Sequence, residues 1–241
     1  MLGIMQPYYL PYWGHFSLIS QTDFWVVFDI TQYTPKTWIN RNKIIHPSKE
    51  WQYLTVSLSN SSIHIKINQA KILFPENTLA EHLQKLKIYE RKAPFYNDVI
   101  DLFIKSFDEL KSNYLVDLNI IFIKNICSYL NIQFNYLKAS DLDISYPNVI
   151  KPGDWALIIC EKLGYRDYLN PLSGRKIFSS EKFNRHKVNL FFHDAKNFIY
   201  ERGNYNFSGN LSIIDTMMWI NPSIIKRTLY SNATIINSKN I

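Results

Sequence analysis

Two segments near the N-terminus combine aromatic and polar side chains in a way that suits ligand binding. The first follows the apolar run Leu2–Met5 and contributes Gln6, Tyr8, Tyr9, Tyr12, Gly14 and His15. Tyrosine rings offer flat surfaces with a hydroxyl group, Gly14 lets a ligand approach the backbone, and a helix start near His15 attracts an anion. We therefore expect a ligand site here. The alternative is that these residues only pack a rigid loop.

The second segment comes directly after another apolar run, residues 24–28. It contributes Asp29, Gln32, Tyr33, Lys36, Trp38, Asn40, Arg41 and Asn42. A carboxylate at a strand end is well placed as a base or as a ligand for an amine or ribose, so Asp29 is a catalytic candidate. Lys36 and Arg41 could neutralise phosphates, and Tyr33 and Trp38 could stack on a ring. The alternative is a solvated loop in which Asp29 and Arg41 pair with each other.

A third candidate lies far along the chain. Asp215 follows Ser212 at the expected start of a helix. It could be a second carboxylate of the site, or it could only complement the positive end of the helix dipole.

Several common site motifs are absent from the sequence. It contains no phosphate-binding Walker loop, dinucleotide-binding glycine fingerprint, nucleophile elbow or cysteine-rich zinc pattern. The six histidines show no pair at the spacing of a helix-borne metal site. We therefore expect neither a metal nor a cofactor.

The hydrophobic pattern predicts the elements that must position these residues. Strands at residues 2–5 and 24–28, separated by a loop and a short helix, predict the βαβ opening of a parallel sheet. Residues 63–67 alternate as an edge strand would. Residues 78–131 are periodic as in helices, and Thr78 with Glu81 could form a capping box. The expected fold is α/β: an N-terminal Rossmann-like parallel sheet, a helical middle and an irregular α+β C-terminal part.

Bulk composition limits the class of protein. The 241 residues are 46% hydrophobic and carry a formal charge of +7, which favours a polyanionic partner or reflects general lysine enrichment. The N-terminus has no signal-peptide pattern and no apolar stretch is long enough for a membrane span. Cys127 and Cys160 lie in apolar helical patterns, which fits a reducing compartment. We expect a cytoplasmic protein with a single domain over residues 1–241.

Several specific strings resemble the WbqC-like family. They are Gln6-Pro7-Tyr8, Pro11-Tyr12-Trp13-Gly14, Gln32-Tyr33, Trp38-Ile39-Asn40-Arg41-Asn42, Ala93-Pro94-Phe95-Tyr96, Tyr168-Leu169-Asn170-Pro171 and Asn210-Leu211-Ser212-Ile213-Ile214-Asp215. The likeness spans nearly the whole chain. The family typically has an aromatic residue at the position of His15, so the role of His15 stays open.

The resemblance implies a role in the biosynthesis of O-antigen, lipopolysaccharide or related surface glycans. We expect a transferase that moves an acyl or aminoacyl group onto the amine of a nucleotide-linked amino sugar, with an acyl donor or aminoacyl-tRNA as the second partner. In this hypothesis Asp29 positions or deprotonates the amine, and Arg41 with Lys36 holds the pyrophosphate. The oligomeric state stays open.

Two alternatives remain at this stage. Gly14-His15 matches the second half of the His-x-Gly-His motif of nucleotidylyl transferases, which favours an ATP-dependent, adenylate-forming enzyme. The basic charge also fits a non-catalytic module that binds nucleic acid such as tRNA.

Overall fold

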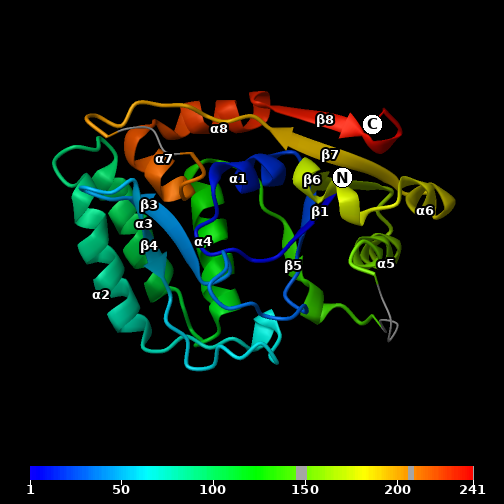
Figure 1. The fold of residues 1–241 in the computed structure, drawn as a ribbon, viewed down its shortest axis with the longest axis horizontal. Helices are drawn as coiled ribbons and strands as arrows, with labels where there is room; N and C mark the ends of the chain where they lie inside the picture. Colours follow the sequence, from blue (N-terminus) through cyan, green and yellow to red (C-terminus); the bar gives the residue numbers. More distant parts are fainter. Residues whose placement is uncertain (145–150, 206–208, 241) are drawn as a thin grey trace.

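A six-stranded sheet forms one side of the molecule, in the order β5-β2-β1-β6-β7-β8 (Figure 1). The computed structural model describes residues 1–144, 151–205 and 209–240. The strands of this sheet are β1 (Leu2–Met5), β2 (Phe24–Val27), β5 (Tyr136–Lys138), β6 (Asp167–Pro171), β7 (Asn189–Ala195) and β8 (Ala233–Asn237). All neighbouring strands are parallel except β7 and β8, which are antiparallel.

The βαβ opening predicted from the sequence is confirmed. The helix α1 (Trp13–Ser20) connects β1 to β2, and the two strands pair in parallel register from Leu2 opposite Phe24 to Met5 opposite Val27. Helices cover both faces of this sheet, which explains why its central strands are continuous apolar runs rather than alternating ones. The fold is thus a mixed α/β arrangement with a mostly parallel sheet. The more specific Rossmann likeness and the single-domain assignment stay predictions.

The middle of the chain is helical, as predicted. It contains α2 (Pro75–Leu86), α3 (Tyr96–Asp108) and α4 (Leu115–Tyr129). The expected capping box is wrong, because α2 begins at Pro75, where the fixed backbone angle of proline suits the first turn, and Thr78 lies inside the helix with its hydroxyl bonded to the Phe74 carbonyl. A separate antiparallel hairpin, β3 (Arg41–Ile45) and β4 (Trp51–Thr55), packs against α2 in the helical half of the molecule (Figure 1).

The C-terminal third is less regular. Its helices are α5 (Asp154–Leu163), α6 (Ser180–Arg185), α7 (Ile213–Trp219) and α8 (Pro222–Ser231). The C-cap of α5 is Gly164, whose φ of 72° is a left-handed conformation that glycine adopts without strain. Short 3-10 helices lie at η1 (Ile67–Gln69), η2 (Lys87–Tyr89), η3 (Ala139–Asp141), η4 (Leu172–Ile177) and η5 (Ser238–Asn240).

The expected strand at residues 63–67 is wrong. Most of this stretch is turn, and η1 begins at Ile67. The alternating isoleucines do not share a buried face, because Ile63 is 52% exposed whereas Ile67 is fully buried. In the part of the chain that the structure describes, no helix has the length and apolar character needed to cross a membrane.

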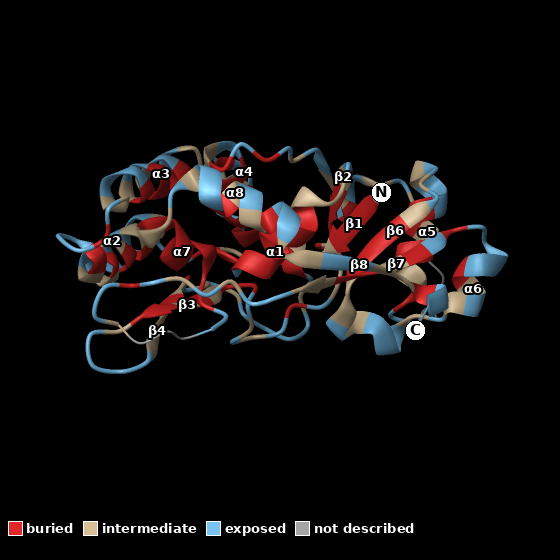
Figure 2. Ribbon diagram, turned by 90° about the horizontal axis from the view of Figure 1, so that it is seen from above, coloured by how far each residue is buried: buried red, intermediate tan, exposed pale blue. Residues whose placement is uncertain are grey.

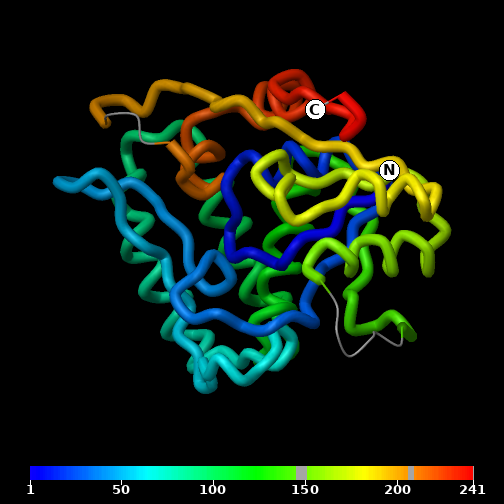
Figure 3. The backbone as a smooth tube through the Cα atoms, turned by 45° about the vertical axis from the view of Figure 1, so that its right-hand side comes forward, coloured from blue at the N-terminus to red at the C-terminus, as the bar shows by residue number. Residues whose placement is uncertain are grey.

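Two apolar cores lie on opposite faces of the sheet. The larger extends from α1 through the helical half and includes Phe16, Phe122 and Met217; the smaller lies under α5 and α6 and includes Leu157 and Phe183. Figure 2 shows the buried strands and α1 at the centre, with exposed surface on the outer helices. In Figure 3 the N-terminal segment, in dark blue, runs from the sheet into the middle of the molecule.

The connections that leave β1 and β6 diverge. From β1 the chain passes over the larger core through α1 to β2, whereas from β6 it passes over the smaller core through α6 to β7. Because β1 and β6 are neighbours in the sheet, the sheet has a topological switch point between them. Open α/β sheets bind ligands in the crevice at the carboxyl ends of such strands.

Candidate functional site

A cavity of about 370 Å³ opens at this switch point. It is lined by Met5, Tyr8, Tyr12, Trp38, Asn42, Pro171, Ser173 and Asn210. The end of β1 and the following loop supply one wall, and the end of β6 with η4 supplies another. This volume lies within the range of about 300–1,000 Å³ that is usual for small-molecule sites.

Buried amides hold the two loops that carry the aromatic side chains. Asn119, on α4, donates hydrogen bonds to the carbonyl groups of Pro7 (2.7 Å) and Ile39 (2.9 Å). Between the loops, the backbone N–H of Tyr9 donates to the Trp38 carbonyl at 2.8 Å. These bonds fix the spacing of the two loops, so that Tyr8, Tyr12 and Trp38 line one cavity without a ligand having to order them.

Asn42 has a structural as well as a lining role. Its amide group donates to the carbonyl groups of Tyr9 (3.1 Å) and Leu10 (2.8 Å). Leu10 has a φ of 45°, a conformation that costs energy for a residue with a side chain, and these two bonds help to maintain it. The turn at Leu10 directs the chain toward Tyr12 and the start of α1.

The third wall comes from Asn210, in the segment that leads into α7 and that is bonded to the same loops. Ser212 N–H donates to the Lys43 carbonyl (2.8 Å), Ile213 N–H donates to the Pro11 carbonyl (3.0 Å), and Tyr12 forms an isolated β-bridge with Ser212. Asn210, two residues before Ser212, lines the cavity.

A buried polar network fixes α7 in this position. Asp215 is fully buried and accepts hydrogen bonds from the hydroxyl groups of Tyr89 and Tyr200, each at 2.6 Å. Its carboxylate also forms an ion pair with Arg202, whose Nε lies 3.0 Å away. Burial raises the pKa of Asp215, and Arg202 and the two hydroxyl groups oppose that rise.

The cavity combines aromatic surfaces, neutral hydroxyl groups and a nearby cation. Burial raises the pKa of Tyr8 and of Tyr12, so both hydroxyl groups stay protonated at neutral pH and can donate hydrogen bonds. The Lys43 ammonium lies 5.9 Å from the centroid of the Trp38 ring and 3.8 Å from that of Trp51. The aromatic side chains can therefore stack on a ring of a ligand, and the tyrosine hydroxyl groups can form hydrogen bonds with the hydroxyl groups of that ligand. The Lys43 ammonium can attract a negative charge next to the ring.

Four of the residues predicted from the sequence meet in this cavity: Tyr8, Tyr12, Trp38 and Asn42. The others surround it or lie elsewhere. Gln6 donates to the Thr31 hydroxyl, Gln32 donates to the Ile63 carbonyl, and Asn40 donates to the Val56 carbonyl. Tyr9 and Tyr33 are buried in the core, where the Tyr9 hydroxyl lies 3.0 Å from His82 Nδ1.

Asp29 lies at the end of β2, beside rather than within the aromatic cavity. Its carboxylate is buried and accepts hydrogen bonds from the Ser140 N–H (2.9 Å) and the Ser140 hydroxyl (2.6 Å). Burial raises the pKa of Asp29, and the bonds from Ser140 oppose the rise. The geometry joins Asp29 to η3 and does not pair it with Arg41.

The two predicted phosphate ligands are also placed apart from the lining. The Arg41 guanidinium lies 4.1 Å from the centroid of the Tyr53 ring, which belongs to the neighbouring strand β4. Lys36 is exposed, at a turn where its φ is 59°. A cation that was not predicted as a site residue, Lys43, lies beside the aromatic wall, with its ammonium 5.9 Å from the centroid of the Trp38 ring.

His15 and Gly14 lie behind the cavity wall. The His15 ring is enclosed by Tyr8, Phe16 and Trp25, and neither of its ring nitrogens has a hydrogen-bond partner among the described residues. Burial lowers the pKa of His15 to about 3. This enclosed, neutral imidazole gives the adenylation alternative no support.

Four lining residues were missed as site candidates: Met5, Pro171, Ser173 and Asn210. Pro171 and Asn210 do occur in the strings that resemble the WbqC-like family, so a signal was present. Asn119 was missed as well, because an asparagine within an apolar helical pattern looks like an interruption rather than a support for two loops.

Gly14 allows the Tyr12 ring to form the cavity wall. A Cβ atom added at Gly14 would lie 2.5 Å from the Tyr12 ring. We expect Gly14→Ala to displace this ring and weaken ligand binding, while the fold persists because Tyr12 is partly exposed and can move and alanine favours the helix. Binding measured in a double-mutant cycle checks this: Gly14→Ala should have almost no further effect in a Tyr12→Ala background. Equal losses in both backgrounds would contradict it.

Buried neutral histidines should make folding sensitive to acid. Burial lowers the pKa of His15 to about 3, and of His82 and His193 to about 4. At a pH below the unfolded-state pKa of about 6.5 and above these folded-state values, the histidines are protonated in the unfolded chain but not in the folded one. The free energy of unfolding therefore falls as the pH falls, by about 1.4 kcal/mol per pH unit for each histidine.

Urea unfolding at pH 6.5 and pH 5 measures this dependence. We expect the wild type to lose roughly 2 kcal/mol more than His15→Phe over this interval, because phenylalanine removes one titrating group. Equal losses in the two proteins would mean that His15 is protonated in the folded state as readily as in the unfolded one.

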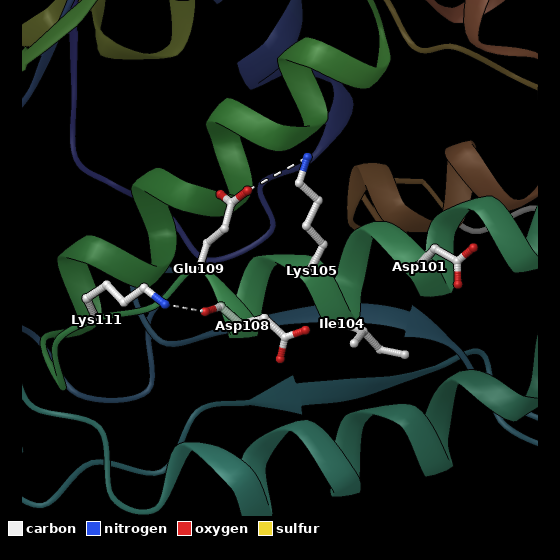
Figure 4. A pocket seen from close by; sticks show the side chains of 6 residues that line it. All are labelled: Asp101, Ile104, Lys105, Asp108, Glu109 and Lys111. Atoms are coloured by element: carbon white, nitrogen blue, oxygen red, sulfur yellow. Dashed lines mark hydrogen bonds and ion pairs between the residues drawn. The ribbon is translucent and has the colours of Figure 1, made fainter.

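A depression along α3, shown in Figure 4, lacks these features. There Lys105 pairs with Glu109 (3.7 Å) and Lys111 donates to the Asp108 backbone carbonyl (3.1 Å). Its charged side chains come from one helix and the turn after it, and no aromatic residue lines it among the described residues. Across the described ranges, no group of three or more His, Cys, Asp or Glu residues is arranged to hold a metal ion.

Comparison with known proteins gives three findings. The model of the WbqC-like protein family matches residues 6–227. The chain is similar to the uncharacterized protein Rv1507c of Mycobacterium tuberculosis, with 24% identity over 218 residues that cover 90% of this chain and 92% of that protein. No solved structure matches. The matched range includes every described residue that lines the cavity except Met5.

Proposed function

Since this chain belongs to the WbqC-like protein family, we propose that it acts in the biosynthesis of bacterial surface polysaccharides. Family membership suggests this role in general terms. Within it, we propose that the cavity at the ends of β1 and β6 binds a nucleotide-linked amino sugar. The observation that carries the proposal is the convergence of Tyr8, Tyr12 and Trp38 at the switch point of the sheet.

The chemistry of the lining supports a sugar ligand. The apolar faces of a sugar ring or a nucleotide base pack against aromatic rings, and Trp38, at 41% exposure, is open to such contact. Ser173 and Asn210 add groups that can bond to hydroxyls. Lys43, beside Trp38, and the net charge of +7 suit the diphosphate of a nucleotide sugar.

The reaction that we propose is transfer of an acyl or aminoacyl group from an ester or thioester donor to the amine of the sugar. The amine nitrogen attacks the acyl carbon, a C–N bond forms, and the C–O or C–S bond of the donor breaks. The released alcohol or thiol takes up one proton and the amine loses one. The neutral hydroxyl groups of Tyr8 and Tyr12 can donate to the carbonyl oxygen as it gains negative charge.

A base must receive the amine proton. Asp29 is the carboxylate at the same edge of the sheet, one strand away from the cavity, and burial raises its pKa toward the range useful for a base. We retain it as the proposed base, with Ser140 as the residue that orients it.

Mass spectrometry of reaction mixtures tests the activity. Nucleotide-linked amino sugars with a free amine are incubated with thioester donors or aminoacyl-tRNA, with and without ATP. We expect an amide product that forms without ATP and that Trp38→Ala reduces. A product that requires ATP and releases pyrophosphate would instead indicate an adenylate-forming enzyme. No product with any donor, together with no sugar binding, would overturn the proposal.

A further inference from the structure

A second, more polar cavity of about 680 Å³ lies at the carboxyl ends of β2 and β5. Three lysines from separate parts of the chain line it: Lys66 before η1, Lys71 after it and Lys138 at the end of β5. The acid among its described lining residues is Asp117, so their net charge is three minus one, or +2. This cavity was not anticipated from the sequence, because its lysines are distant along the chain.

The lysines are only partly neutralised. Lys138 lies 3.9 Å from both Asp117 and Asp141, which is a long separation for an ion pair. Asp117 also accepts a hydrogen bond from the Ser112 hydroxyl at 2.6 Å. Lys71 lies 5.4 Å above the Tyr114 ring, and Lys66 has no ion pair with a described residue. An anion that enters the cavity would therefore meet ammonium groups that can reorient toward it.

The backbone adds to this positive potential. The first turn of α4 contributes Val116 and Asp117 to the wall, and no side chain caps that end of the helix. The Leu115 N–H already donates to the Ala70 carbonyl, and the Asp117 carboxylate lies in this first turn. The remaining N–H groups and the positive end of the helix dipole favour an anion there. This effect alone would not define a site, but it acts in the same direction as the three lysines.

An oxygen atom in the wall adds a different preference. The Ser140 hydroxyl donates a hydrogen bond to Asp29, so its oxygen is left as an acceptor. This oxygen can accept from a ligand hydroxyl, whereas the ammonium groups attract an anion. Asn68 also lines the cavity, but its amide oxygen is buried beneath the surface.

We propose that this cavity binds a sugar phosphate, with the phosphate against Lys66, Lys71 and Lys138 and a sugar hydroxyl against Ser140. The assignment stands on this cavity alone and does not require the function proposed for the aromatic cavity. The two cavities open at the same edge of the sheet, so two ligands could be held side by side.

Titration calorimetry with glucose 1-phosphate, inorganic phosphate and glucose tests the assignment. We expect glucose 1-phosphate to bind more tightly than inorganic phosphate, and glucose alone not to bind measurably. The double variant Lys66→Gln/Lys71→Gln should bind glucose 1-phosphate more weakly than the wild type. We expect a loss of about tenfold in affinity for each lysine replaced, because charge-assisted hydrogen bonds are lost. Lys124→Gln, an exposed lysine on α4 outside the cavity, makes the same kind of charge change and should leave binding unchanged.

Hydrogen exchange locates the ligand independently of these variants. Glucose 1-phosphate should slow exchange in residues 60–71 and at the start of α4. Unchanged affinity in the double lysine variant, or protection confined to the aromatic cavity, would overturn the assignment. If a nucleotide-linked amino sugar binds and Trp38→Ala abolishes this binding, but glucose 1-phosphate does not bind, only the assignment of this second site is wrong. If glucose 1-phosphate binds here but no nucleotide-linked amino sugar binds the aromatic cavity, the proposed function is wrong and this second site remains.

Discussion

Trp38→Ala is expected to weaken binding of a nucleotide-linked amino sugar by about tenfold to a hundredfold, since stacking on an aromatic side chain contributes about 1–3 kcal/mol. Trp38 lines the cavity and is 41% exposed, so its ring is available to a ligand and contributes little to the core. Loss of the ring also frees Lys43 from one of its two aromatic neighbours, although Trp51 remains beside it. We therefore expect the unfolding free energy to change by no more than about 0.5 kcal/mol.

Tyr230→Ala is the matched control for this variant. Tyr230 lies on α8, is 45% exposed and does not line the cavity. Calorimetric titration should give the wild-type affinity for Tyr230→Ala and the reduced affinity for Trp38→Ala. Equal affinities in the two variants would place the ligand away from Trp38.

Asp215→Asn is expected to cost about 3–5 kcal/mol of unfolding free energy, the usual consequence of removing one partner of a buried ion pair. The carboxylate faces Arg202 and accepts from both Tyr89 and Tyr200. An amide has the same shape but no charge, and only one of its two polar atoms can accept a hydrogen bond. Because this network supports α7 and the adjoining Asn210 wall, ligand binding should weaken too.

Urea denaturation of three proteins separates this effect from a general charge effect. Asp101→Asn, at an exposed position on α3, should change the unfolding free energy by less than about 0.5 kcal/mol. The double variant Asp215→Asn/Arg202→Met should recover part of the loss, because it also removes the guanidinium whose carboxylate is missing. A loss in Asp215→Asn no larger than that in Asp101→Asn would show that the network contributes little to stability.

Local patterns predicted the elements whose sequence signals are strong. The apolar runs at residues 2–5 and 24–28 predicted strands and the periodicity within residues 78–131 predicted helices, and these predictions are confirmed by β1, β2 and α4. The strand predicted at residues 63–67 is wrong because alternation of apolar and polar residues indicates a strand only where one face is buried, and Ile63 is exposed. The strand β8 was missed because it is a partly exposed edge strand that pairs only with β7.

The site could be predicted only where its residues lie close in sequence. Tyr8 and Tyr12 follow β1 directly, and Trp38 and Asn42 follow β2, so the expectation that strand ends carry ligand residues was enough. Ser173 and Asn210 reach the same cavity because β6 pairs with β1 and because α7 is bonded to the loop after β1. Strand order and such long-range bonds are properties of the folded chain, and no local spacing encodes them.

The same limit explains the placement of Asp29 and Arg41. The sequence puts them twelve positions apart after one strand, which made a shared site reasonable. In the folded chain Ser140, far along the sequence, holds Asp29, and Tyr53 across the hairpin holds Arg41. Their partners are contacts that only the tertiary structure creates.

Thermal unfolding across a panel of nucleotide-linked amino sugars tests the central claim most directly, because it asks whether the aromatic cavity binds this class of ligand. A ligand at about one hundred times its dissociation constant adds roughly 2.7 kcal/mol of stability. We predict that at least one sugar nucleotide raises the melting temperature of the wild type and that Trp38→Ala abolishes the rise while Tyr230→Ala keeps it. A rise that persists unchanged in Trp38→Ala, or no rise with any member of the panel, would contradict the claim.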